Sequence, residues 1–456
     1  MGASDRERVR GRVRGRGGHT VVDRGAWDRR TLLLGAAALT GAAATAPLLG
    51  GTATAYVRSG DADALFEAGE FERAGRAYER ILRKDPANMH AARRRGHVAL
   101  LSNRFPEAEK YLTTALNLAP DDKRTNRLLA DCYTRQDKFP LAVPRWHAAG
   151  EESYAEQFAA IQGTPYQIHG DTARVPWQQT DPFPLVEASI NGGPPKKFSF
   201  YTHVDALGLS AKLAKEAGLK AVAKQRIDAF GDVIWLYYGV LDSFHLGGIE
   251  LRNIPVGWSE RESGGEVAPD AHDGMIGTWV FYHFLTTFDY AGRSLILRRR
   301  TPETAQRARA DAARAGARPL PLWLAGGHLL FTEGSVTDVA GSKAGVVSLN
   351  LGGTGEQVAG ISEETAKRLG VRVDYDRPFA SFAAGRPVEG YPCYPRELRL
   401  GGVTAKSLYS YAGGKDTLGD EGFHKVAGFD HAFHKPNNIT LDFTDMNAYV
   451  ARGKAA

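Results

Sequence analysis

Three side chains with useful chemistry stand at matching places in two similar stretches of the chain. Tyr201 and His203 belong to one predicted turn, and Asn350 lies 149 residues further on. A phenol and an imidazole can exchange protons with a bound small molecule or hold an oxyanion, whereas a carboxamide only donates and accepts hydrogen bonds. The alternative is that the three side chains simply fill the contact between two structural units.

The elements that would position these residues occur twice. In each stretch an apolar strand enters a tight turn, and a Ser followed by a short helix comes next. Ser210 and Ser362 are 152 residues apart, and Leu246-Gly247-Gly248 and Leu400-Gly401-Gly402 are 154 apart. Offsets this steady indicate a duplicated unit, and the short alternating strands within each copy predict a mainly-β structure.

The duplicated pattern resembles the retropepsin-like aspartic peptidase fold. In that family an apolar strand runs into Asp-Thr-Gly, a hairpin flap covers a cleft, and an apolar-apolar-Gly segment lies behind the turn. Met275-Ile276-Gly277 and Val426-Ala427-Gly428 match that last segment. The resemblance implies two lobes, residues 183–300 and 320–456, joined by a helical linker over 301–319, so that a monomer would hold both halves.

Neither copy keeps the family's aspartate. The three turn positions hold Tyr201-Thr202-His203 in the first copy and Asn350-Leu351-Gly352 in the second. Aspartic peptidase chemistry needs two neighbouring carboxylates whose repulsion separates their pKa values. The resemblance therefore implies a catalytically inactive pseudo-peptidase whose cleft binds a peptide or protein ligand by strand addition.

Two other functions stay open. An active aspartic peptidase could use non-standard carboxylates, and Asp205 is four residues past Tyr201. A non-proteolytic enzyme could use Tyr201 and His203, facing Asn350, in the cleft between the lobes. Two carboxylates within about 4 to 6 Å of each other at the lobe interface would make the peptidase possible again.

The resemblance also predicts which residues line the cleft. Thr202 keeps the hydroxyl that bonds across to the other lobe in the family, and Gly352 keeps a glycine that permits close backbone approach. Flaps are expected near residues 230–238 and 379–390. Trp235, Tyr237 and Phe382 are the flap side chains that we expect to touch a ligand.

The residues before the duplicated unit repeat every 34 positions, as two sets show: Phe71, Phe105 and Phe139, and Ala74, Ala108 and Ala142. This period resembles tetratricopeptide repeats and predicts an all-α solenoid over residues 56–163. Such an array binds a peptide or partner on one face, or serves only as a packing module. A linker is expected over 164–182.

Residues 1–55 resemble a twin-arginine signal. They carry nine Arg against four acidic residues, then an uncharged run that ends in Ala53-Thr54-Ala55. We expect export across a bacterial inner membrane, with an uncleaved membrane anchor as the alternative. Because this leader holds five of the six net positive charges, no nucleic-acid surface is expected in the rest of the chain.

No cofactor is expected, since the sequence has no dinucleotide fingerprint and no Gly-rich phosphate loop. His424, His431 and His434, with Asp430, could suggest a metal site. In the first copy, however, His283 matches His434 with no second histidine nearby. A packing or hydrogen-bonding role is therefore expected, and no metal.

Overall fold

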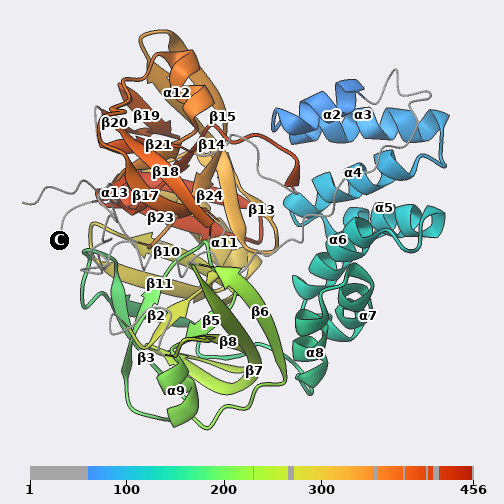
Figure 1. Cartoon of the computed structure of the whole chain (residues 1–456), viewed down its shortest axis with the longest axis vertical. Coiled ribbons are helices and arrows are strands. Elements are labelled where there is room, and N and C mark those ends of the chain that lie inside the picture. The colour runs from blue at the N-terminus through green and yellow to red at the C-terminus, as the bar shows by residue number, and fades with distance from the viewer. Residues whose placement is uncertain are drawn as a thin grey trace, which may run out of the picture.

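The computed structural model describes most of the chain that follows the leader (Figure 1). The described residues are 60–229, 231–264, 272–353, 357–383, 386–406, 409–413 and 421–453, with only the backbone described for 380–383 and 386–388. The predicted export leader over 1–55 lies outside these residues. Within the described ranges no helix is long and apolar enough to cross a membrane.

The N-terminal part of the described chain is an array of helices packed in pairs. Asn88 and Asp122, 34 residues apart, begin two equivalent helices, and each side chain accepts a hydrogen bond from the backbone N–H three residues later. The repeated alanines are fully buried, which lets neighbouring helices approach closely. The helices are α2 (Gly60–Glu67), α3 (Phe71–Lys84), α4 (Met89–Leu101), α5 (Phe105–Leu118), α6 (Lys123–Thr134), α7 (Phe139–Ala149) and α8 (Glu152–Ala160).

The first lobe is built on an eight-stranded sheet in the order β1-β8-β5-β9-β4-β3-β7-β6. Its short α9 (Ala211–Glu216) follows β5, and α10 (Thr278–Tyr282) follows β9. The strands are β1 (Gln167–His169), β3 (Leu185–Ile190), β4 (Lys196–Phe200), β5 (Leu207–Leu209), β6 (Ala223–Ala229), β7 (Asp232–Leu246), β8 (Ile249–Arg261) and β9 (Gly274–Ile276).

The second lobe is built on a ten-stranded sheet in the order β17-β18-β21-β16-β22-β15-β14-β19-β20, with β13 beside β14. Its α12 (Glu363–Leu369) follows β16, and α13 (His431–His434) follows β22. The strands are β13 (Trp323–Ala325), β14 (Leu329–Asp338), β15 (Gly341–Leu349), β16 (Ala359–Ile361), β17 (Phe379–Ala383), β18 (Arg386–Cys393), β19 (Glu397–Leu400), β20 (Val403–Lys406), β21 (Ser410–Ala412) and β22 (Ala427–Phe429).

A six-stranded sheet joins the two lobes, in the order β12-β24-β23-β10-β11-β2. At its centre the closing strands of the lobes pair with each other, and Thr287 and Thr440 share a hydrogen bond between their hydroxyls at 2.9 Å. Its strands are β2 (Thr172–Pro176), β10 (Phe284–Asp289), β11 (Ser294–Arg299), β12 (Pro319–Pro321), β23 (Asn437–Asp442) and β24 (Asn447–Arg452), and α11 (Pro302–Arg314) connects the lobes.

The segment over 164–182 is more ordered than the linker that the sequence predicted. It contains β1, which pairs with β8, and β2, which pairs with β11 along five residues. Ala173 and Val175 on β2 alternate with exposed neighbours and are buried, as expected for a strand with one covered face. This segment therefore belongs to the β region.

The two lobes repeat the same central arrangement. β4 pairs in parallel with β9, and β15 pairs in parallel with β22, with Phe200 opposite Ile276 and Leu349 opposite Phe429. This register corrects the sequence comparison by two residues: Gly277 is equivalent to Asp430, and not to Gly428. The correction changes which side chain stands behind the second turn.

The first helices of the array pack against the second lobe (Figure 1). Phe423, fully buried, lies between Phe66 and Phe71, with ring centroids 6.1 and 5.1 Å away. Just before it, the carboxylate of Glu421 pairs with His97 Nε2 at 3.2 Å, and the His424 backbone N–H donates to the Glu67 oxygen at 2.8 Å. The last residues before β22 are thus held in the helical array.

The later helices of the array pack against the first lobe. Gln157 on α8 donates to the backbone oxygens of Gly239 and Val256, each at 2.9 Å, from a buried position. The array therefore contacts the second lobe through its first helices and the first lobe through its last helix.

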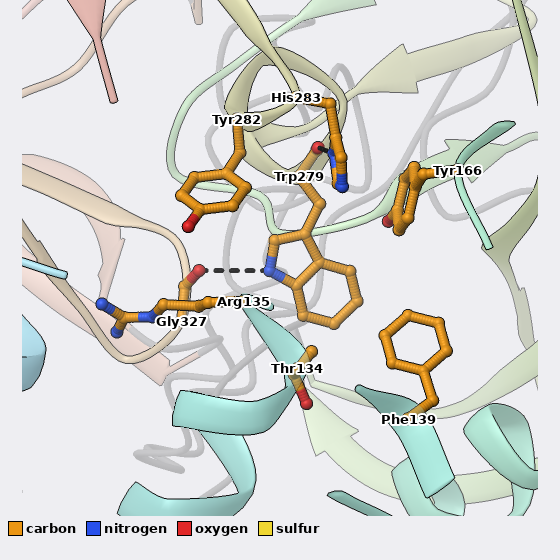
Figure 2. Close-up of a pocket in the computed structure, with 8 residues that line it drawn as sticks. All are labelled: Thr134, Arg135, Phe139, Tyr166, Trp279, Tyr282, His283 and Gly327. Carbon is orange, nitrogen blue, oxygen red and sulfur yellow. Dashed lines mark hydrogen bonds between the residues drawn. The ribbon is translucent and has the colours of Figure 1, made fainter. Parts of the chain in front are cut away.

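A small cavity lies where α6 and α7 meet the lobes (Figure 2). Trp279 donates its indole N–H to the Gly327 oxygen at 3.1 Å, and the rings of Tyr166 and His283 stack with centroids 3.7 Å apart. The cavity volume is about 10 Å³, near the minimum for one water molecule. Side chains from the helices and from both lobes thus fill most of this joint.

Candidate functional site

The two predicted turns lie against each other at the lobe interface. Tyr201 and Gly352 form a β-bridge, which joins the residue after β4 to the turn after β15. The Thr202 N–H donates to the Leu351 oxygen at 3.0 Å, and the Gly353 N–H donates to the Phe200 oxygen at 3.2 Å. Backbone hydrogen bonds therefore bring Tyr201, His203 and Asn350 together, as the sequence suggested.

Thr202 holds the two turns together with its side chain as well. Its fully buried hydroxyl donates to the Leu349 oxygen at 2.9 Å and accepts from the Leu351 N–H at 3.0 Å. The matching position in the second lobe is Leu351, which has no hydroxyl to return the contact. Of these two matched positions, only Thr202 thus uses its side chain to hydrogen-bond the opposite turn.

Tyr201 fits because the opposite turn is made of glycines. A Cβ on Gly353 would lie 2.6 Å from the Tyr201 ring, and one on Gly352 would lie 1.9 Å from the Phe200 oxygen. Burial, with the charge of Asp430 nearby, raises the pKa of Tyr201. Its phenol is therefore neutral at ordinary pH, and it shares a hydrogen bond with His203 Nδ1 at 3.2 Å.

His203 is also held neutral. Burial is the largest cause that lowers its pKa to about 3, with Lys425 and His328 adding to the effect and the Asn350 amide opposing it. The sequence suggested that Tyr201 and His203 could exchange protons with a ligand. Both groups are therefore neutral near neutral pH, and proton exchange with a ligand stays a prediction.

Asp430 is the residue of this site that the sequence comparison did not place at the turns. Asn350 Nδ2 donates to Asp430 Oδ1 at 2.5 Å, so a carboxylate that directly follows β22 lies beside the second turn. Burial raises the pKa of Asp430 to about 6, although Asn350 and Lys425 oppose that rise. We call Tyr201, His203, Asn350 and Asp430 the interlobe site.

The acceptor oxygens of the interlobe site have few donors among the described residues. Asn350 is 5 % exposed, and its buried Oδ1 makes no well-formed hydrogen bond, although Asn350 lies close enough to His203 to raise the pKa of that imidazole. Asp430 is partly exposed, and only its Oδ1 accepts a hydrogen bond. A buried carbonyl oxygen without a donor costs about 1 to 3 kcal/mol. The site is therefore short of donors.

Asp205 has a structural role outside the interlobe site. Its Oδ2 accepts from the Tyr154 hydroxyl at 2.8 Å, and its Oδ1 accepts from the Ala206 N–H at 2.6 Å. Tyr154 belongs to α8, so Asp205 ties the first lobe to the helical array. Both carboxylate oxygens are engaged, which does not favour a role as a substitute catalytic base.

The predicted flaps are hairpins, β6–β7 and β17–β18. Trp235 and Tyr237 lie on one face of β7 and contact their own sheet: Lys224 Nζ is 4.9 Å from the Trp235 ring, and Tyr237 stacks on Trp258 at 5.7 Å. Phe382 is on β17, but its side chain lies outside the described residues. Their contact with a ligand stays a prediction.

The histidines beside Asp430 bind backbone. His431 Nε2 donates to the Thr180 oxygen and His434 Nε2 to the Phe429 oxygen, each at 3.1 Å. Burial lowers the pKa of His431 to about 4 and that of His434 to about 3. In the part of the chain that the structure describes, no three His, Cys, Asp or Glu residues are grouped to hold a metal ion.

Comparison with known proteins identifies one part of the chain. Residues 65–132 match the tetratricopeptide repeat family, and they span α3 to α5 with most of α6. A search of the curated proteins found no match. The chain thus consists of an N-terminal tetratricopeptide-repeat region followed by a mainly-β region with several sheets.

Proposed function

We propose that the β region is a two-lobed, retropepsin-like unit that has lost peptidase chemistry and binds an extended peptide between its lobes. The matched central strands of the two lobes, the turns that meet at their interface and the sheet that both lobes share support this fold. The hairpins at the predicted flap positions support the binding mode, since exposed strand edges can add a peptide strand.

One observation supports the proposed loss of peptidase chemistry. The two strands that should end in aspartate end in Tyr201 and Asn350, and the one carboxylate beside them is Asp430. Among the described residues, the groups that shift the pKa of Asp430 are Asn350 and Lys425, and no second carboxylate is among them. Without a coupled pair, one group cannot be acid while the other is base.

The rival enzymes have less support. A non-proteolytic enzyme that uses Tyr201 or His203 as an acid or base would need one of them to titrate near neutral pH, and burial moves both pKa values away from neutrality. An active peptidase would need a second carboxylate next to Asp430. Glu356, the remaining acidic residue near the second turn, lies outside the described residues.

The test is digestion of a diverse, unstructured peptide library by the full chain, at acid to neutral pH, read by mass spectrometry. Variants Tyr201→Phe and Asn350→Ala are run alongside. We expect no cleavage and retention of a subset of peptides, with weaker retention by Asn350→Ala. Cleavage by the parent protein overturns the inactive assignment, and absence of both cleavage and retention overturns peptide binding.

Export remains part of this proposal, on the sequence of residues 1–55 alone. The twin-arginine pattern would carry the chain across a bacterial inner membrane to the periplasm or beyond. Fractionation of cells that express the full chain, with Arg29→Lys and Arg30→Lys together as the altered leader, tests it. Retention of both forms in the cytoplasm would overturn export.

A further inference from the structure

We infer that the surface which α2, α3 and α4 present to the second lobe recognises a peptide with an acidic residue two positions before an aromatic one. Residues 421–424 occupy this surface as an internal ligand, and a partner that carries such a peptide displaces them. We call these four residues the internal ligand. The inference concerns the repeat region and is independent of the interlobe site. It names a partner chemistry that the tetratricopeptide match leaves open.

The first argument is the aromatic anchor of the internal ligand. Phe423 is fully buried, and its ring lies edge-on to those of Phe66 on α2 and Phe71 on α3. A third ring, that of Phe331 on β14, has its centroid 5.3 Å away, again edge-on. Edge-to-face contacts between rings are favourable beyond the apolar area that they bury. Three rings therefore select an aromatic side chain at this position.

The second argument is the carboxylate two positions earlier. Glu421 Oε2 accepts a hydrogen bond from His97 Nε2 at 3.2 Å, and the Glu421 side chain is 20 % exposed. Burial raises the pKa of this carboxyl, yet the nearby His97, Arg124 and Arg127 lower it overall. The helices α4 and α6 thus offer basic side chains to an ionised carboxylate at this place.

The third argument is that the internal ligand is held as a separate peptide would be. The Glu421 backbone oxygen accepts from Arg94 at 3.4 Å, and the His424 N–H donates to the Glu67 oxygen at 2.8 Å. Glu67 is the last residue of α2, where carbonyl oxygens lack helical partners. Between these two contacts Gly422 has a φ of +73° and an irregular backbone. These contacts do not depend on a regular strand, so a free peptide could make them too.

The fourth argument concerns release of the internal ligand. It lies outside the named helices and strands, and His424 at its end is exposed. Loops with few buried apolar contacts open at a lower free energy than the regular elements around them. The array has another contact with the second lobe, because the ring of Trp323 on β13 lies 4.9 Å from that of Phe71. The array can therefore stay on the second lobe while a partner peptide replaces the internal ligand.

The experiment uses the full chain and a fluorescein-labelled hexapeptide with the sequence of residues 421–426. Phe423→Ala removes the aromatic anchor of the internal ligand and leaves the side chains of α2 to α4 unchanged. Binding measured by fluorescence anisotropy should be at least about tenfold tighter for this variant than for the parent protein. The matched control is Phe443→Ala, which removes another fully buried ring of the β region and should gain no binding.

Changes in the peptide test the recognised chemistry without altering the protein. Alanine in place of the phenylalanine should abolish binding to the Phe423→Ala protein, and glutamine in place of the glutamate should weaken it about threefold to tenfold. If Phe423→Ala does not fold, Glu421→Gln takes its place, because it keeps the ring and removes only a partly exposed charge. Its gain in peptide affinity over the parent protein should be about threefold.

The outcomes are clear for this site. Tighter binding by the variant that depends on both peptide side chains supports the inference. Equal binding by the parent protein and the variant, binding to neither, or binding that ignores the two peptide side chains overturns it. A gain by Phe443→Ala as large as that by Phe423→Ala also overturns it. The interlobe proposal is tested separately by the peptide library.

Discussion

The two lobes place nearly the same backbone at their interface but fill it with opposite kinds of side chain. The first lobe supplies bulk, with Tyr201 and neutral His203 in front of Gly277. The second lobe supplies acceptors, with Asn350 in front of Asp430 and only glycines where the first lobe has His203. The bulky side chains of the site thus come from the first lobe, and its acceptor side chains come from the second.

This difference separates what maintains the fold from what does chemistry. The bridge between the turns and the Thr202 contacts use backbone groups and one hydroxyl, and no carboxylate takes part in them. The carboxylate of the interlobe site belongs to Asp430, which directly follows a neighbouring strand. A framework of this kind can keep its geometry while its chemistry changes, because different atoms are responsible for each.

The largest expected effect comes from breaking the close approach of the turns. Gly352→Ala puts a methyl group 1.9 Å from the Phe200 oxygen, at a residue whose φ is +78°. We expect the free energy of unfolding to fall by about 3 to 5 kcal/mol or the protein to be insoluble. Urea unfolding followed by tryptophan fluorescence measures it.

The matched control for that change is Gly402→Ala in the second lobe. Nothing lies within 4 Å of the added methyl group, so the free energy of unfolding should change by less than about 0.5 kcal/mol. Similar losses in the two variants would show that the turn contact does not stabilise the lobe interface.

The next largest effect comes from removing the hydrogen bonds that the Thr202 hydroxyl makes across the lobe interface. Thr202→Val removes the hydroxyl that serves Leu349 and Leu351, and leaves a buried carbonyl and a buried N–H unsatisfied. A loss of about 2 to 4 kcal/mol is expected in urea unfolding. Thr202→Ser keeps the hydroxyl and should lose about 1 kcal/mol; a reversed order would contradict the assigned role of the hydroxyl.

The smallest effect is the contribution of Asp430 to the pH dependence of stability. The pKa of Asp430 is raised from 3.8 to about 6 in the folded protein, so the folded state binds this proton more tightly than the unfolded state does. Its contribution to stability is fully present below about pH 4 and is lost as the pH rises to about 6. The loss should be about 1 to 3 kcal/mol.

Asp430→Asn tests that pH dependence, since its amide oxygen can still accept from Asn350 Nδ2. The free energy of unfolding of the variant minus that of the parent protein should rise by about 1 to 3 kcal/mol between pH 4 and pH 6, because buried histidines such as His203 and His434 contribute an opposite pH dependence to both proteins. Asn350→Asp, which sets a second carboxylate against the first, should steepen the fall. An unchanged profile in Asp430→Asn would remove Asp430 as its source.

The repeats could be predicted from the sequence because their structure is local. A period of 34 residues fixes the helix pairs, and Asn88 and Asp122 mark equivalent helix starts within it. What the array packs against could not be predicted, because Phe423 and Trp323 come from distant parts of the chain. Tertiary contacts of that kind leave no periodic pattern.

The interlobe site could be predicted in part, because a repeated sequence pattern marks its two turns as well. Tyr201, Thr202 and Asn350 end strands whose apolar patterns repeat, so their meeting could be expected. Asp430 could not be placed, since the comparison aligned Gly428 with Gly277, and only the pairing of Leu349 with Phe429 shows the shift of two residues. Strand register between distant segments depends on packing, which spacing alone does not reveal.

The segment before β22 connects the helical array to the interlobe site through a short stretch of chain. Phe423 and Glu421 contact the helices, and three residues separate Phe423 from β22, which Asp430 directly follows. β22 is itself paired with β15 and β16. The helices and the sheet therefore hold this one segment from both ends, so the position of Asp430 depends on both parts of the protein.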